Sequence, residues 1–168
     1  MLGGKIVDYT MKDGTAYSIN EAHKEQWDEA TEMAFKVFLK YEAAEYGKEG
    51  TQKFIEFLTS VNLYKLFLQG LYKMYVATVD EEIIGIISYR NGNHISLLFV
   101  DDRYHKMGVG RELIKTVQND ILSHGEYEIM TVNASPYGVP FYKKVGFAVT
   151  DEEQHTDGII YTPMEMYL

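Results

Sequence analysis

The stretch that decides the fold is LLFVDDRYHKMGVGRELI, residues 97–114. It opens with an apolar run that ends at Val100, continues through a polar loop that contains Gly108 and Gly110, and then becomes an amphipathic segment. This pattern predicts a buried strand, a loop and a helix that begins near Gly108. Glycine lets the backbone approach a ligand closely, and the first N–H groups of a helix have no partner within the helix. The junction therefore predicts a site for a phosphate group.

The charge around this junction favours an anionic ligand. Residues 103–115 hold four Lys or Arg and one Glu, whereas the whole chain of 168 residues has a formal net charge of −9. The dinucleotide-binding fingerprint fits poorly, because Leu113 stands where its third glycine belongs, and the phosphate loop G-x-x-x-x-G-K-[ST] is absent. The alternative interpretation is a helix start with two flexible glycines and no ligand.

The elements around the junction follow from hydrophobic spacing and turn residues. Asn20 is the predicted N-cap of the first helix. Helices, an antiparallel meander and then alternating strands and helices predict one α+β domain, residues 1–168, with three layers around a mixed, mostly antiparallel sheet. We expect strands over residues 5–9, 15–19, 73–79, 83–90, 94–100, 127–133, 147–150 and 159–166, and helices over 21–40, 51–69, 108–123 and 135–145.

A second informative stretch is TVNASPYGVPFYKKVGF, residues 131–147. Ser135 is a predicted N-cap with Pro136 in the first helical position, and Gly146 is a predicted left-handed cap at the other end. Tyr142 lies on this short helix, and amphipathicity does not assign it to one face. It is either a core residue with a satisfied hydroxyl or a proton donor in a cleft.

Together the two stretches resemble the GNAT superfamily of N-acetyltransferases. HKMGVG (105–110) is similar to that family's [Q/R]-x-x-G-x-[G/A] after an apolar strand, and FYKKVGF (141–147) is similar to its [F/L]-Y-x-x-x-G-F. The 32 positions from Gly110 to Tyr142 fit the helix, strand and helix that separate the two patterns in the family. The resemblance covers nearly the whole chain, and the ending 163–166 is similar to the family's last strand.

The resemblance implies a single GNAT-like domain whose sheet splays beside residues 98–100, with acetyl-CoA as co-substrate. The pyrophosphate would lie on the N–H groups of residues 107–111, and the pantetheine arm would pair with the backbone of 98–100. His105 stands where the family usually has Gln or Arg. Ser135 stands where many relatives carry an Asn, and the nearby Asn133 could supply the missing amide group. The implied cofactor-binding residues are Leu98, Phe99, Val100, His105, Lys106, Met107, Gly108, Val109, Gly110, Arg111, Asn133 and Ser135.

The resemblance also implies direct attack of a primary amine on the thioester in a ternary complex, with Tyr142 as general acid toward the leaving thiolate. The base in such proteins often stands six residues before the last apolar residue of the strand, which here is His94. Strand alternation predicts that His94 shares a face with Ser96 and Leu98, and the ordinary pKa of histidine suits a base. A histidine that merely follows the 91–93 turn is an equally good interpretation.

The sequence defines the binding site for the acceptor amine less well than the site for the co-substrate. Residues 21–70, which build acceptor pockets in the family, are rich in acidic and aromatic side chains. They indicate either a cleft for a cationic amine, such as a polyamine or an aminoglycoside, or a solvated acidic face over an ordinary core, which we favour. A peptide N-terminus or a lysine is equally open. A non-catalytic acyl-CoA-binding or regulatory module with the same fold is the alternative to an enzyme.

Composition narrows the remaining possibilities. The chain has no cysteine, which excludes disulfides, thiolate metal ligands and a cysteine nucleophile, and no histidine spacing predicts a metal site. The net charge of −9 disfavours nucleic acid and anionic membranes as partners. Without a signal-peptide pattern or an apolar run of about 18 residues, we expect a cytoplasmic protein. The oligomeric state is open, a homodimer included.

Overall fold

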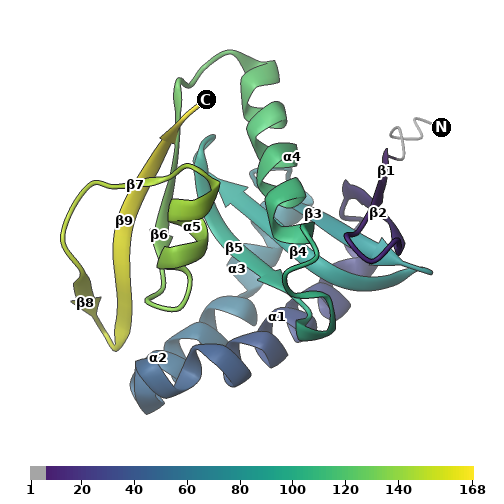
Figure 1. Ribbon diagram of the computed structural model, residues 1–168. Helices are drawn as coiled ribbons and strands as arrows, with labels where there is room; N and C mark the ends of the chain where they lie inside the picture. Colours follow the sequence, from purple (N-terminus) through teal and green to yellow (C-terminus); the bar gives the residue numbers. More distant parts are fainter. Residues whose placement is uncertain (1–6) are drawn as a thin grey trace.

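The computed structural model describes residues 7–168 and contains a mixed sheet with helices on both faces (Figure 1). The predicted strand 5–9 therefore lies partly outside the described residues. The strands are β1 (Val7–Thr10), β2 (Ala16–Glu21), β3 (Tyr72–Val79), β4 (Glu82–Arg90), β5 (His94–Val100), β6 (Ile129–Ala134), β7 (Ala148–Val149), β8 (Gln154–Thr156) and β9 (Ile159–Tyr167). The α-helices are α1 (Trp27–Tyr41), α2 (Ala43–Leu58), α3 (Val61–Leu68), α4 (Val109–His124) and α5 (Val139–Val145).

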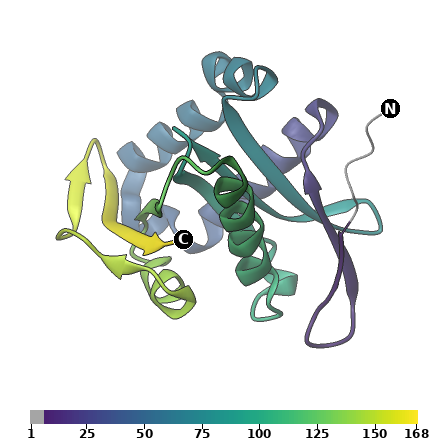
Figure 2. The ribbon, with the colours of Figure 1, turned by 90° about the horizontal axis from the view of Figure 1, so that it is seen from above.

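The predicted fold class is confirmed. The sheet has the strand order β1-β2-β3-β4-β5-β6-β9-β7, with β8 paired to β9, and every strand pair in the described residues is antiparallel except β5–β6. Helices α4 and α5 cover one face, and α1, α2 and α3 cover the other (Figures 1 and 2). No helix within residues 7–168 is long and apolar enough to cross a bilayer.

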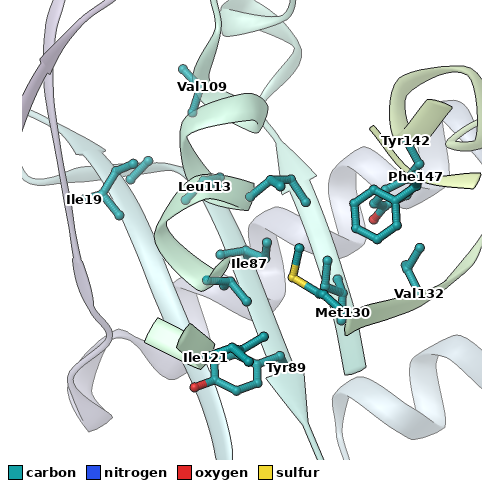
Figure 3. Close-up of a cluster of buried hydrophobic side chains, with 14 of the residues drawn as sticks. Ile19, Ile87, Tyr89, Val109, Leu113, Ile121, Met130, Val132, Tyr142 and Phe147 are labelled. Carbon is teal, nitrogen blue, oxygen red and sulfur yellow. The ribbon is translucent and has the colours of Figure 1, made fainter. Parts of the chain in front are cut away.

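Each face of the sheet buries its own apolar cluster. On the α4 face, Leu113 and Ile121 of α4 pack over Ile87 and Tyr89 of β4 (Figure 3). The opposite cluster is rich in aromatic side chains from α1–α3, so most aromatic residues of the 21–70 segment are core. Those that are buried or partly buried there are Trp27, Phe35, Phe38, Tyr46, Phe54, Phe57, Tyr64 and Phe67.

The sheet is splayed between β5 and β6, as the resemblance implied. These two strands pair over only two positions, His94 with Thr131 and Ile95 with Val132. Beyond Ile95, β5 continues to Val100 without a partner on that edge, while β6 turns to pair with β9. The end of β5 therefore keeps one edge open between the two helical layers.

A bulge at Ser96 reverses the side-chain alternation of β5. On β4, Ser88 pairs with Leu97 and Tyr89 pairs with Ile95, so Ser96 is an extra residue. Ile95 accordingly packs in the cluster beneath α4, whereas Leu97 packs in the cluster beneath α1–α3. Leu98 then packs on the α4 face. The prediction that Leu98 shares a face with His94 is therefore wrong, because simple alternation does not survive a bulge.

The start of the first helix also differs from the prediction. Asn20 caps no helix, because it lies in β2 opposite Val76 of β3. Helix α1 begins only at Trp27, after a 3-10 turn over Lys24–Gln26. Pairing with a strand that is distant in sequence outweighs the local preference of Asn for an N-cap.

The predicted helix 51–69 is two helices in the structure. Ser60 separates α2 from α3, and its hydroxyl accepts the N–H of Leu63 at 3.3 Å as the N-cap of α3. The glycine break predicted near Gly47 is a kink inside α2, where Gly47 has a φ of 71°. A serine cap within an otherwise amphipathic run is a weaker signal than a glycine, which explains the missed boundary.

Helix α5 begins at Val139 rather than at Ser135. The Ser135 hydroxyl accepts the N–H of Gly138 at 3.0 Å and so stabilises the turn that leads into the helix. Pro140, and not Pro136, stands in the first helical turn. The other end is as predicted, because Gly146 closes the helix with a φ of 115°.

Candidate active site

The loop between β5 and α4 presents a run of unpaired backbone donors. Lys106 and Gly108 have positive φ values of 63° and 94°, and Gly108 is the N-cap of α4. The first backbone bond of the helix is donated by Glu112 to the carbonyl of Gly108. Within the described residues, the N–H groups of 107–111 make no hydrogen bond. Such a run at a helix N-terminus fits a phosphate group.

The two glycines of this loop have different tasks. A Cβ on Gly108 would meet no atom within 4 Å, so the space above its backbone is open. A Cβ on Gly110 would lie 3.1 Å from Cζ of Phe141, a ring carried by α5. The sequence suggested that both glycines allow a ligand to approach. The space above Gly108 is open to a ligand, whereas at Gly110 the absence of a Cβ is also required by packing between α4 and α5.

Ion pairs with carboxylates neutralise part of the positive charge near the loop. Arg103 turns away to the carboxylates of Asp101 and Glu82, and Lys115 lies 3.4 Å from Glu112. Lys106 and Arg111 are exposed and make no ion pair within residues 7–168. These two cations are left to face a ligand on the loop. No cluster of three His, Asp or Glu side chains in this part of the chain is arranged for a metal.

His105 contacts the end of β5 rather than the open loop. Its Nε2 lies 2.6 Å from the carbonyl oxygen of Val100, to which it donates. Its ring lies 5.1 Å from that of Tyr41, which in turn stacks on Tyr137 of the turn before α5, also at 5.1 Å. His105 thus helps to fix the strand end and the row of rings beside it.

The open edge of β5 is formed by alternate backbone groups. The N–H of Asp101 donates to the carbonyl of Ile84 on β4 at 2.8 Å. In an antiparallel ladder the backbone N–H and C=O groups of neighbouring residues point to opposite edges of the strand. The backbone groups of Phe99 therefore also point toward β4, whereas those of Leu98 and Val100 point into the gap toward β6. The Leu98 amide and the Val100 N–H are therefore the groups that an extended ligand could pair with.

Tyr142 is placed at the same gap from the α5 side. Its ring is 7% exposed and packs edge-on against Phe141 and Phe147, beside Val132 of β6 (Figure 3). Its hydroxyl makes no hydrogen bond within the described residues. Burial, together with the nearby Glu42 carboxylate, raises the pKa of Tyr142 above that of an ordinary phenol. The ring belongs to the core, but the hydroxyl lacks the partner that a purely structural tyrosine was expected to have.

His94 lies at the start of the splay, on the face of α2. Its Nδ1 is 2.8 Å from the hydroxyl oxygen of Thr131, its register partner on β6. Burial, with a smaller effect of the Arg90 guanidinium, lowers the pKa of His94 below 6.5. The ring is therefore neutral at pH 7 and has one nitrogen beyond the bond to Thr131.

A pocket of about 370 Å³ opens at His94, between β5, β6, α2 and the β8–β9 turn. Asn133 lies in its wall and is exposed, whereas the Ser135 hydroxyl is engaged with Gly138. The residues that line the pocket are Tyr46, Lys53, Arg90, His94, Ile95, Ser96, Asn133, Thr156, Asp157, Ile159 and Tyr161. We call it the acceptor-side pocket.

Sequence reasoning missed Thr131 and Arg90 as neighbours of His94. The parallel pairing that brings Thr131 there joins strands separated by a helix, so no local signal shows it. Arg90 was within reach of prediction, because a hairpin through residues 91–93 puts Arg90 opposite His94.

The class of the protein is that of α+β domains with a splayed mixed sheet, which here has a loop of unpaired backbone donors on one side of the gap and a pocket on the other. The chain belongs to the GNAT acetyltransferase family: residues 42–168 match the model described as the acetyltransferase (GNAT) domain. This family uses acetyl-CoA as its co-substrate. A curated relative, the uncharacterised N-acetyltransferase YafP of Escherichia coli, is 33% identical over 82 residues, which is 49% of this chain and 50% of that protein. The match thus spans about half of that relative's length.

Solved structures agree on the fold. A GCN5-related N-acetyltransferase from Rhodopseudomonas palustris has a TM-score of 0.78 at 21% identity and covers 98% of this chain and 100% of its own. The PaiA N-acetyltransferase of Thermoplasma acidophilum, solved with coenzyme A, has a TM-score of 0.74 at 19% identity and covers 90% and 99%. At these identities the likeness concerns the fold alone.

Proposed function

We propose that this protein transfers the acetyl group of acetyl-CoA to a primary amine of an acceptor. The observation that carries the proposal is the meeting of two half-sites at the splay. Unpaired N–H groups of the α4 loop lead to the open edge of β5, and the acceptor-side pocket with His94 opens on the opposite face of the same strand. Both substrates can therefore reach one stretch of backbone, which is what direct transfer requires.

The residues at the loop and strand fit the co-substrate. The N–H groups of 107–111 would hold the pyrophosphate, with positive charge from Lys106 and Arg111. Backbone groups of Leu98 and Val100 would pair with the pantetheine amides, while Phe99 faces β4. When bound, acetyl-CoA supplies an acetyl group activated as a thioester. The tight positive-φ turn at Gly108 leaves room for a phosphate directly above the backbone.

His94 is the proposed base. An alkyl amine has a pKa of about 10 and is almost wholly protonated at neutral pH, so it has to lose a proton before it attacks. The neutral His94 ring can donate from Nδ1 to the hydroxyl oxygen of Thr131, which leaves the lone pair of Nε2 to accept that proton. Asn133, from the adjacent wall, is positioned to bind the acceptor or the end of the pantetheine arm.

Tyr142 is the proposed acid, which returns a proton to the leaving sulfur. Because burial raises the pKa of its phenol, the hydroxyl stays protonated at neutral pH. The flanking rings of Phe141 and Phe147 fix its direction, and no protein acceptor competes for its proton within the described residues. Ser135 has a supporting role at most, since its hydroxyl accepts the Gly138 N–H.

A titration with acetyl-CoA, NAD and ATP, followed by thermal unfolding, tests the co-substrate. We expect stabilisation by acetyl-CoA alone, and a ligand at a hundred times its dissociation constant adds about 2.7 kcal/mol. Absence of any stabilisation by acetyl-CoA would overturn the assignment of the loop. Binding of acetyl-CoA without release of free thiol over a broad amine panel would instead favour the non-catalytic acyl-CoA-binding module.

Substitution of the two proton-transfer residues tests the chemistry. Tyr142→Phe should lower kcat by about 10²-fold with little change in the affinity for acetyl-CoA, because only the hydroxyl is removed. Tyr137→Phe, an exposed tyrosine of the preceding turn, is the matched control and should retain activity. The rate with wild-type protein should fall as the pH drops through the lowered pKa of His94, and His94→Gln should abolish that limb of the profile. An unchanged profile in His94→Gln would refute the base.

A further inference from the structure

The charges of the acceptor-side pocket do not match an acidic cleft, which was the less favoured interpretation of the sequence. The charged side chains that line the pocket are Lys53, Arg90 and Asp157, and His94 in the same lining is neutral. Cations therefore outnumber carboxylates in its wall. The acidic residues of α2 that could have formed a cleft for a polyamine lie outside this lining and are exposed, namely Glu45, Glu49 and Glu56. Glu42, between α1 and α2, is also outside the lining, but it is half-buried and its carboxylate acts on Tyr46 of the pocket wall and on Tyr142.

Arg90 is the best placed of these charges. It lies directly opposite His94 in the β4–β5 ladder, so the two side chains rise from the same face of the sheet. Its guanidinium carbon is 6.0 Å from the ring centre of Phe57, whose face restricts where the group can turn. Arg90 makes no ion pair with any carboxylate in residues 7–168. A guanidinium that borders a pocket and has no protein counter-ion is suited to bind an anion.

Lys53 adds a second positive charge from the opposite wall. Its ammonium is 3.8 Å from Glu56, in an exposed pair one helical turn apart. Such a pair contributes little stability, so the lysine can turn toward a ligand at small cost. Asp157 belongs to the turn between β8 and β9 and is exposed, as Arg90 and Lys53 are, so water screens all three charges and the lining carries two cations against one carboxylate.

We propose that the acceptor carries a carboxylate on the same molecule as its amine, with Arg90 as the main carboxylate ligand and Lys53 as the second. This inference rests on the proposed function. Arg90 and His94 are direct neighbours across the ladder, so a carboxylate held on the guanidinium leaves the amine of a short molecule within reach of His94. A polyamine would instead bring its second ammonium against two cations. Free amino acids and the chain ends of peptides share the required chemistry.

Matched pairs of amines test this preference. The first pair is 4-aminobutyrate and 1,4-diaminobutane, which have equal chain length and differ in the group at the far end. The second pair is alanine and alanylalanine, which separates a free amino acid from a peptide. We expect kcat/KM for 4-aminobutyrate to exceed that for 1,4-diaminobutane by at least about tenfold, since a charge-assisted bidentate pair replaces a repulsion.

Variants assign the effect to the pocket. Arg90→Met should lower kcat/KM for carboxylate-bearing amines by about tenfold or more and leave 1,4-diaminobutane unaffected or improved. Lys53→Met should act in the same direction with a smaller factor. Lys48→Met, an exposed lysine of α2 that does not line the pocket, is the matched control and should behave as wild type. A preference for the diamine, or an Arg90→Met variant with unchanged selectivity, would overturn the inference while acetyl transfer itself stands.

A binding measurement separates this inference from the proposed reaction. In protein saturated with CoA, 4-aminobutyrate should shift the imidazole NMR signals of His94, and Arg90→Met should weaken that binding by about tenfold or more. If 4-aminobutyrate binds in a manner that depends on Arg90 but no amine is acetylated, the carboxylate site is supported and the proposed acetyl transfer is refuted. No binding to wild-type protein at millimolar 4-aminobutyrate, alanine and alanylalanine would refute the carboxylate site, whatever the enzyme acetylates.

Discussion

Replacing each glycine of the α4 loop by alanine should separate ligand binding from packing. At Gly108 the backbone has a φ of 94°, a conformation that costs a residue with a Cβ roughly 1–2 kcal/mol. No neighbouring atom obstructs that Cβ, so the loss of stability should stop there. The methyl group would, however, project into the open space over the unpaired N–H groups. Losing one or two phosphate hydrogen bonds, each worth about 1.5–3 kcal/mol, should weaken CoA binding by about 10- to 100-fold or more.

Gly110→Ala should have the opposite signature. The φ of Gly110 is not in the left-handed region, and alanine favours a helix by about 0.5–1 kcal/mol over glycine. Its Cβ would lie 3.1 Å and 3.2 Å from two ring carbons of Phe141, so that ring has to shift. Overpacking of this kind costs about 1–3 kcal/mol, which the gain in helix propensity partly offsets. We therefore expect a loss of up to about 2 kcal/mol, with CoA affinity within a factor of three of wild type.

Urea unfolding and calorimetric titration with CoA measure the two quantities separately. Adding Phe141→Leu to Gly110→Ala should recover stability, because the smaller side chain removes the close contact, and a double-mutant cycle quantifies that coupling. The same substitution added to Gly108→Ala should recover nothing. The assignment fails if Gly108→Ala binds CoA like wild type, or if Gly110→Ala loses affinity as strongly as Gly108→Ala.

Three further substitutions test the supports around the site. Asp120→Asn should destabilise the protein by about 2 kcal/mol at pH 7 in urea unfolding. Burial acts to raise the pKa of Asp120, but hydrogen bonds from Tyr89 and Lys73 outweigh burial and lower that pKa. The difference in stability between wild type and variant should therefore be complete above pH 3.8 and vanish as the pH falls further. Tyr72→Phe should cost about 1–2 kcal/mol in urea unfolding, because the fully buried Ser88 hydroxyl, 2.7 Å from the Tyr72 hydroxyl, loses its partner. Glu42→Gln should raise stability at pH 7 but not below pH 4.5, because burial raises the pKa of this carboxyl and makes its charged form unfavourable in the folded protein.

The conformation of the loop between β5 and α4 was predictable from sequence because its signals are local. The bounds of β5 and the start of α4 follow from an apolar run and two glycines within one short stretch, and the structure has both where expected. The distinction between Gly108 and Gly110 was not predictable, because it depends on the ring of Phe141, which arrives from a helix about thirty residues away in sequence.

Errors arose where strand pairing overrides local preference. Asn20 is a good N-cap by residue type, yet the ladder between β2 and β3 extends over it. Leu98 was placed on the wrong face of β5, because the bulge at Ser96 leaves no mark in the alternation of residue types. The two interpretations of the acidic, aromatic segment 21–70 could not be separated from sequence, because which of several nearby charges line a pocket is a tertiary property; Glu45, Glu49 and Glu56 are exposed, as the favoured interpretation expects.

The bulge at Ser96 lies between the two half-sites proposed for β5. Before the bulge, His94 faces the α2 side and the acceptor-side pocket; after it, Leu98 faces the α4 side. The hydroxyl of Tyr72 lies 2.9 Å from that of Ser96 and 2.7 Å from that of Ser88, so a buried network fixes the bulge from beneath. Without a cysteine the chain cannot carry the acetyl group on a thiol, and the proposed direct transfer requires that the thioester and the amine meet beside this segment of β5. Tyr72→Phe should accordingly lower kcat by a larger factor than it raises the KM for either substrate, because it loosens the strand segment that sets their relative position.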